Sequence, residues 1–264
     1  MIGINPFSFL SETVSPMVMQ GFILAMVFLI ASGTIIQMII HKNITYFFNN
    51  AKKAKLSATR EISATEKISI ISKTIVYDIG TTAELGFGKR RLAHVLGMYG
   101  TILFWISSVV LVFSYTGAEK MSSPTWSMLW HVGAILTCIG GYWFWLFLRV
   151  DVSAEAHPWY RIIKADLFVL ALLACATFGL AWSYTQYNGL TTLSFLFLTL
   201  FMLSNLILFG GVYWSKFAHM IYKPGAAIQK NLAEADGSRD NLPAPSDAPK
   251  QFGLGIKREQ PKHY

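Results

Sequence analysis

The stretch KRRLAHVLGMYG, residues 89–100, sets three basic residues and a histidine at the head of an apolar run that continues to residue 115. A helix needs about 20 apolar residues to cross the roughly 30 Å hydrocarbon layer of a bilayer. The run is long enough, and lysines and arginines gather at the cytoplasmic ends of such helices. The stretch therefore predicts a membrane-spanning helix that begins at the cytoplasmic face.

The chain contains five apolar runs of this kind. We expect them to form membrane spans at residues 17–40, 92–115, 126–148, 165–186 and 190–214. The composition agrees, because 53% of the 264 residues are hydrophobic and only 14% are charged, whereas about a quarter of the residues in soluble domains are charged. The predicted fold class is all-α, an integral membrane bundle of five helices within residues 1–222.

The basic residues predict how this bundle is oriented. Of the 22 lysines and arginines, ten lie in the loop 41–91, three in the segment 149–164 and eight in the tail from residue 215. Since cytoplasmic loops are enriched in lysine and arginine, we expect the N-terminus outside and the C-terminus in the cytoplasm. This bias and the attraction to anionic lipid headgroups explain the net charge of +8, so nucleic-acid binding is not expected.

Two segments look unlike membrane spans. The cytoplasmic loop 41–91 contains a patchy amphipathic helix around Ile68–Val76, which we expect to lie at the membrane surface. The tail 223–264 is rich in Pro, Asp, Gly and Ser, and we expect it to be disordered on its own. The basic surface that these segments offer could steer an acidic partner, although attraction to lipid explains the same charge.

Two of the six histidines lie at matching places. His94 is at the cytoplasmic start of the second span, and His219 is just beyond the cytoplasmic end of the fifth. Two helices with histidines at one depth can supply both axial ligands of a haem b held between them. His94 and His219 are therefore candidate ligands of a haem iron. A single histidine beside basic residues at a membrane surface is more commonly just solvated.

Residues around these histidines fit a haem, and each also fits a simpler role. Gly97 and Gly100 would let a flat ring lie close to the helix backbone, but glycines in membrane helices more often let two helices pack together. Arg90, Arg91 and Lys216 could pair with haem propionates or, equally, with lipid headgroups.

His131 lies near the outer end of the third span, next to Trp130. A neutral imidazole can hydrogen-bond to a quinone oxygen and carry its proton, so His131 and Trp130 are a candidate quinone site. Trp130 also fits the ordinary belt of aromatic residues at a membrane surface.

Five spans with histidines on the second and at the foot of the fifth resemble the nitrate reductase gamma-like family of membrane cytochrome b subunits, over most of residues 1–222. That family carries four haem-ligating histidines, and His94 and His219 match its cytoplasmic-side pair. Phe104 stands ten residues after His94, and Phe201 stands eighteen before His219. Eighteen residues of one helix rise about 27 Å, which joins the two faces of a membrane. The outer ligand pair is absent, so the resemblance implies one haem b.

Within that group, the stretches GFGKRRLAHVLGMYG (86–100) and KADLFVLALLACATFGLAWSY (164–184) look most like the membrane anchors that accompany adenylylsulfate reductase in sulfur-oxidising bacteria. This resemblance implies a subunit of the bacterial inner membrane. It also implies a cytoplasmic partner that holds FAD and iron–sulfur clusters and oxidises sulfite with AMP to adenylylsulfate. Electrons would pass between this partner and quinone.

The sequence contains no motif for substrate chemistry of its own, so we expect an electron-transfer component of an oxidoreductase complex and not a catalyst alone. One alternative is a haem-free membrane anchor that only docks the soluble reductase. A small transporter is the least favoured alternative, because the span interiors hold almost no ionisable side chains and transport paths normally need them.

Overall fold

The computed structural model describes residues 2–40, 42–86, 88–116, 124–150, 157–215, 217, 219–239, 251–252 and 256–257. The chain consists of two compact units. The first unit combines residues 1–37 with 89–218, and the second unit combines residues 38–88 with 219–264.

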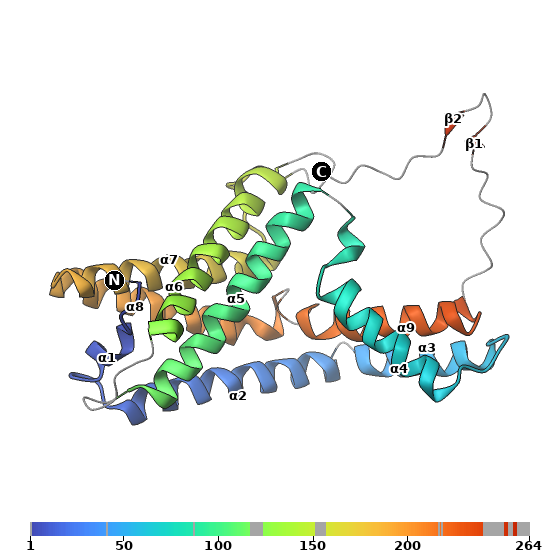
Figure 1. The fold of residues 1–264 in the computed structure, drawn as a ribbon, viewed down its shortest axis with the longest axis horizontal. Helices are drawn as coiled ribbons and strands as arrows, with labels where there is room; N and C mark the ends of the chain where they lie inside the picture. The colour runs from blue at the N-terminus through green and yellow to red at the C-terminus, as the bar shows by residue number, and fades with distance from the viewer. Residues whose placement is uncertain are drawn as a thin grey trace. The chain divides into compact units, whose positions relative to one another are not determined.

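The first unit contains the long helices of the chain (Figure 1). After the short helix α1 (Pro6–Leu10) they are α2 (Pro16–Ile40), α5 (Lys89–Ser114), α6 (Pro124–Trp143), α7 (Leu167–Tyr187) and α8 (Thr191–Gly210). A π-helical turn at Phe144–Leu148 extends α6, and 3-10 turns at Lys164–Asp166 and Gly211–Tyr213 precede α7 and follow α8.

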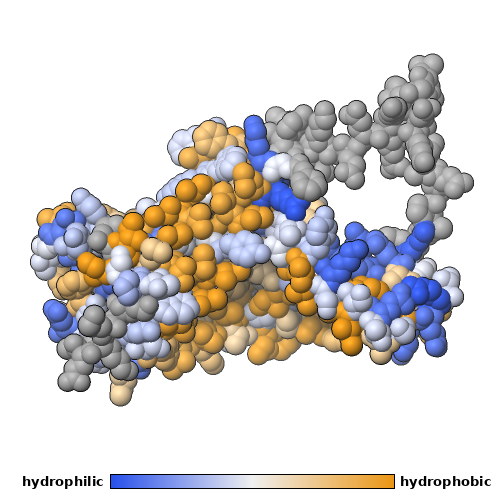
Figure 2. All heavy atoms as spheres, in the orientation of Figure 1, coloured by the Kyte–Doolittle hydropathy of each residue, from blue (hydrophilic) through white to orange (hydrophobic). Residues whose placement is uncertain are grey.

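With these turns included, five helices are long and apolar enough to cross a membrane. They run over Pro16–Ile40, Lys89–Ser114, Pro124–Leu148, Lys164–Tyr187 and Thr191–Tyr213. Their mean hydropathy lies between 1.5 and 2.4, and Figure 2 shows hydrophobic side chains over much of the visible face of this unit. The five predicted spans are thereby confirmed to within about three residues, as is usual for helix ends. The chain has the helices of a multi-pass membrane protein.

The backbones of α5 and α6 lie in close contact. This pair and the pair of α7 with α8 are the most closely packed helices of the unit. A methyl group built at Gly100 would come within 2.5 Å of the backbone nitrogen of Thr137. A methyl at Gly140 would come equally close to the backbone nitrogen of Gly97, and one at Gly133 would also meet the α5 backbone. Small residues let membrane helices approach in this way, so these glycines fix the α5–α6 pair.

Aromatic side chains fill the centre of the first unit. Phe7 of α1 packs edge-on against Trp130 of α6 and Trp182 of α7, with ring centroids 5.9 and 5.4 Å apart. Phe201 of α8 stacks on Trp182 at 5.8 Å, and Phe104 of α5 lies 5.0 Å from Trp130. All five side chains are buried. We call them the aromatic cluster; such ring pairs add roughly 0.5–1.5 kcal/mol each beyond the area that they bury.

A buried ion pair closes the connection between α6 and α7. Arg149 is fully buried, and its guanidinium pairs with the Asp166 carboxylate, with Nε 3.3 Å from Oδ1. It also donates to the carbonyl oxygens of Pro158 and Arg161 at 3.1 and 2.7 Å, and it lies 4.3 Å from the centre of the Trp145 ring. A charge beside a membrane span is costly unless it is paired. Here all three guanidinium nitrogens have partners.

The second unit is built from shorter helices. They are α3 (Asn43–Leu56), α4 (Ala64–Lys73) and α9 (His219–Ala235), with a π-helical turn at Thr74–Ile79, a 3-10 turn at Ala83–Leu85 and the antiparallel strands β1 (Gln251–Phe252) and β2 (Ile256–Lys257). Asn231 of α9 donates to Thr74 Oγ1 at 2.7 Å and to Asp78 Oδ2 at 2.6 Å. Beside α4, the Arg60 guanidinium lowers the pKa of the Glu66 carboxyl to which it is hydrogen-bonded.

The predicted boundary at residue 222 falls inside α9. Residues 223–235, which we expected to be disordered, are helical because one face of the helix packs against α4 and the turn that follows it. Ala233 of this helix is buried. Within the rest of the tail, residues 240–250, 253–255 and 258–264 lie outside the described part of the chain.

Replacing Gly133 by leucine is expected to disrupt the α5–α6 pair. Overpacking at such a contact costs about 1–3 kcal/mol, which lowers the unfolding midpoint by roughly 3–10 °C for a chain of this size. The midpoint can be followed in detergent through the reaction of the buried Cys175 thiol with a fluorescent maleimide. Gly21→Leu is the matched control, because a methyl at Gly21 meets nothing within 4 Å. Equal midpoints for the two variants would contradict the contact.

Replacing Arg149 by leucine leaves the Asp166 carboxylate buried without its cation. Removing one partner of a buried pair costs about 3–5 kcal/mol, so Arg149→Leu should unfold well below the double variant Arg149→Leu/Asp166→Leu in the same assay. Arg60→Leu serves as the control, because its pair with Glu66 is exposed and such pairs contribute about 0–1 kcal/mol. The same midpoint for the single and the double variant would show that an unpaired Asp166 carboxylate carries no cost at this position.

Candidate functional site

His94 lies in the second turn of α5, three residues after Arg91, and its side chain is exposed. Three residues further along, Gly97 leaves open space: a methyl built there meets no atom within 4 Å among the described residues. A flat ring could therefore lie against this side of α5 and reach the imidazole. Gly100 instead faces α6, so of the two glycines only Gly97 leaves room beside His94.

The other residues predicted to hold a haem lie in both units. Arg90 and Arg91 are half-buried in the first turn of α5. His219 is the first residue of α9 and belongs to the second unit. The side chain of His219 and the whole of Lys216 lie outside the described residues. The pairing of His94 with His219 therefore stays a prediction.

The fifth span and α9 are separate helices. α8 ends at Gly210, a 3-10 turn runs to Tyr213, and α9 begins at His219. Phe201 and His219 thus do not share one continuous helix, and the eighteen residues between them are not five α-helical turns. The break coincides with Gly210 and Gly211, and glycine has a low helix propensity.

Phe104 and Phe201 stand where the resemblance places an outer pair of haem ligands. Their ring centroids are 6.3 Å apart, and both belong to the aromatic cluster. Trp130 and Trp182 complete the packing around them. At this level, the contact between α5 and α8 is made by aromatic rings.

His131 is fully buried, and both of its ring nitrogens have hydrogen-bond partners. Nδ1 lies 2.7 Å from the carbonyl oxygen of Ser127, and Nε2 lies 2.8 Å from Ser183 Oγ. Because a carbonyl oxygen only accepts, Nδ1 carries the proton, and Nε2 of a neutral ring accepts from the Ser183 hydroxyl. His131 therefore links α6 to α7, and in this tautomer Nε2 has no proton to donate to a quinone oxygen.

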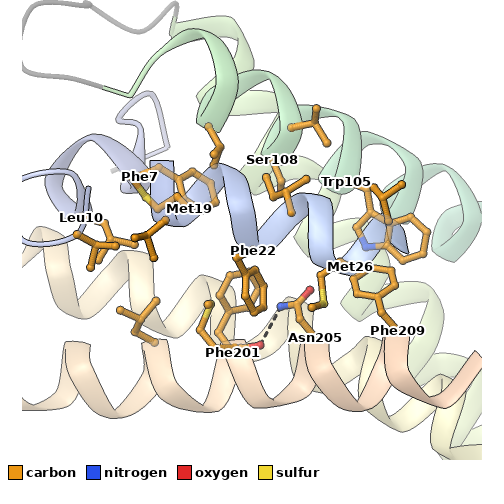
Figure 3. Close-up of a pocket in the computed structure, with 18 of the residues that line it drawn as sticks. Phe7, Leu10, Met19, Phe22, Met26, Trp105, Ser108, Phe201, Asn205 and Phe209 are labelled. Carbon is orange, nitrogen blue, oxygen red and sulfur yellow. Dashed lines mark hydrogen bonds between the residues drawn. The ribbon is translucent and has the colours of Figure 1, made fainter. Parts of the chain in front are cut away.

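Trp130, the second quinone candidate, is connected to an apolar cavity of about 330 Å³ in the first unit (Figure 3). Trp130 Nε1 donates to Ser108 Oγ at 2.9 Å. Ser108 and Phe104 both line the cavity, whereas Trp130 and His131 do not. The cavity lies between α1, α2, α5 and α8, and sequence reasoning missed it because its wall comes from four separate helices. Asn205, an amide within the apolar run of α8, was the one signal that pointed to it.

No group of three or more His, Cys, Asp or Glu side chains that could hold a metal occurs among the described residues. Two histidines suffice for a haem, which is why the haem prediction rests on His94 and His219 alone.

No protein-family model matches the chain, and neither does any curated protein or any solved structure.

Proposed function

We propose that this chain is the membrane anchor and electron-transfer subunit of a cytoplasmic reductase, and that it passes electrons between this partner and the quinone pool through one haem b. The observation that carries the proposal is the environment of His94. Its imidazole is exposed at the end of a membrane-spanning helix, and Gly97 leaves an open surface beside it. An accessible imidazole with open space beside it could receive the edge of a haem.

In this proposal His94 supplies one axial nitrogen and His219 the other. Arg90, Arg91 and Lys216 provide positive charge for the two propionates. A haem b is a one-electron carrier, so a two-electron flavin donor can be oxidised through it in two one-electron steps.

The proposed partner carries FAD and iron–sulfur clusters, and our first candidate is adenylylsulfate reductase. It would dock on the cytoplasmic side of a bacterial inner membrane, where the orientation predicted from the basic residues places the second unit. Exposed lysines on α3, at positions 52, 53 and 55, offer positive charge to an acidic partner.

A haem-free anchor is the second candidate, and one observation favours it. Gly100, which the haem prediction uses, is occupied by the α5–α6 contact. A chain that only holds a soluble reductase at the membrane needs the helices and the second unit but no cofactor.

The haem proposal predicts a spectrum. The chain purified in detergent should give a dithionite-reduced minus air-oxidised difference spectrum of haem b, with one haem per chain by pyridine haemochrome assay. His94→Ala and His219→Ala should each lose at least most of this haem, because each removes one axial ligand. His157→Ala makes the same change in the segment between α6 and α7 and should keep it.

Absence of haem from a wild-type preparation that unfolds cooperatively would overturn the haem proposal and leave the haem-free anchor. Full haem content in both ligand variants would show that other residues hold it.

A further inference from the structure

The cavity of the first unit has the size and position of a binding site. Its volume, about 330 Å³, is at the lower end of the roughly 300–1,000 Å³ of ligand pockets. Figure 3 shows its wall built from α2 on one side and from α5 and α8 on the others. Met19, Phe22 and Met26 contribute from α2, and Phe201 and Phe209 from α8.

The cavity reaches the lipid-facing surface of the unit. Val18 and Val27 of α2 and Val109 of α5 line it, and they are 62%, 54% and 42% exposed. These helices are candidate membrane spans, so the surface around these valines is one that a bilayer covers. A molecule dissolved in the bilayer can therefore enter between α2 and α5 without crossing water.

Three polar side chains break the apolar wall. Ser108 already donates to the carbonyl oxygen of Phe104 and accepts from Trp130 Nε1, which leaves Trp105 and Asn205. Trp105 Nε1 is buried and finds no hydrogen-bond partner in the described part of the chain, which costs about 1–3 kcal/mol. Asn205 is 8% exposed, and one of its amide hydrogens is donated to the carbonyl oxygen of Phe201 at 2.8 Å. Its amide oxygen has no hydrogen-bond partner among the described residues. In Figure 3 the Asn205 amide and the nitrogen edge of the Trp105 indole both turn toward Met26.

This combination selects a ligand class. An indole N–H only donates, so the missing partner is an acceptor, and the cavity has no ionisable side chain to hold a charged one. A water molecule is not expected to be this acceptor, because apolar cavities tend to stay dry. Met26 and Met19 are flexible and can move aside to let an acceptor reach the indole.

We infer that this cavity binds a lipid-soluble molecule with an apolar body and a carbonyl oxygen, and that the oxygen accepts from Trp105 Nε1. Two sources in a bilayer have this chemistry: the ester carbonyl of a phospholipid chain and the ring carbonyl of a quinone. The inference does not need the haem, because no predicted haem residue lines the cavity.

The test uses the full chain in detergent and two probes, decylubiquinone and a phosphatidylglycerol with brominated acyl chains. Both quench tryptophan emission on contact. We expect saturable quenching by one of the probes, and the identity of that probe distinguishes a quinone from a phospholipid. Trp105→Phe keeps the aromatic ring but removes the donor, so its Kd should be roughly three- to tenfold weaker. Trp130, which contacts Phe104 in the cavity wall, still reports binding in this variant.

Asn205→Leu, which keeps the volume and removes the amide, should also weaken binding. Trp214→Phe is the matched control, because it makes the same change at an exposed residue outside the cavity and should leave the Kd unchanged. A cooperative thermal transition in each variant excludes misfolding as the cause. Quenching that rises linearly with both probes, or a Kd that is the same in Trp105→Phe and wild type, would overturn the inference. Because no predicted haem residue lines the cavity, the haem-ligand variants His94→Ala and His219→Ala should bind the probe with the Kd of wild type, which separates this inference from the haem proposal.

Discussion

The backbone contact between α5 and α6 is the interaction on which the first unit depends. Lipid removes most of the hydrophobic drive for helices to associate, so membrane helices are held by close packing. Gly100, Gly133 and Gly140 let the two backbones touch, which sets the rotation of both helices. That rotation turns Phe104 and Trp130 inward to form the aromatic cluster with α7 and α8.

The same arrangement explains why a cavity exists. α5 with α6 and α7 with α8 form tight pairs, whereas α2 packs through long side chains such as Phe22 and Met26. Gln20 reaches the carbonyl oxygen of Val112 at 3.4 Å, and the α2 backbone comes close only further along, at Gly33 beside Val212. A helix held at this spacing leaves room for a ligand between itself and the tight pairs.

Buried polar groups of the first unit are of two kinds: some link neighbouring helices, and others have no hydrogen-bond partner among the described residues. His131 is satisfied at both nitrogens, and Arg149 is satisfied at all three. His131 and Arg149 both link α6 to α7, and they do so at opposite ends of this helix pair. Trp105 Nε1 is of the second kind and lies in the cavity wall, unlike the other unpartnered side-chain atoms of the described spans, which belong to Thr34, Gln37, Ser107, Ser127 and Gln186. In a lipid environment, where polar groups are normally satisfied within the protein, Trp105 is therefore a group that a ligand in the cavity can satisfy.

Much of the fold could be predicted from the sequence, because apolar runs of this length leave a chain little choice. The run after Arg91 predicted α5, and all five spans were found in the same way. The helix α9 was missed because the composition of residues 223–264 as a whole predicts disorder, whereas residues 226–235 consist mostly of good helix formers such as Ala, Leu, Gln and Glu. The partner of Arg149 was missed since it depends on the connection folding back to Asp166. Gly100 was compatible with both a haem and a helix contact, and only the position of Thr137 decides between them.

The most direct measurement of the central claim is electron exchange between the purified chain and a quinone. In a stopped-flow instrument, the haem b reduced with stoichiometric dithionite is mixed with decylubiquinone, the air-oxidised chain is mixed with decylubiquinol, and the haem b absorbance is followed in both runs. Electron transfer between the quinone pool and this subunit predicts haem oxidation by the quinone or haem reduction by the quinol, and a slower reaction in His94→Ala wherever that variant keeps some haem. A haem that reacts with neither, or a preparation that holds no haem, would contradict the claim.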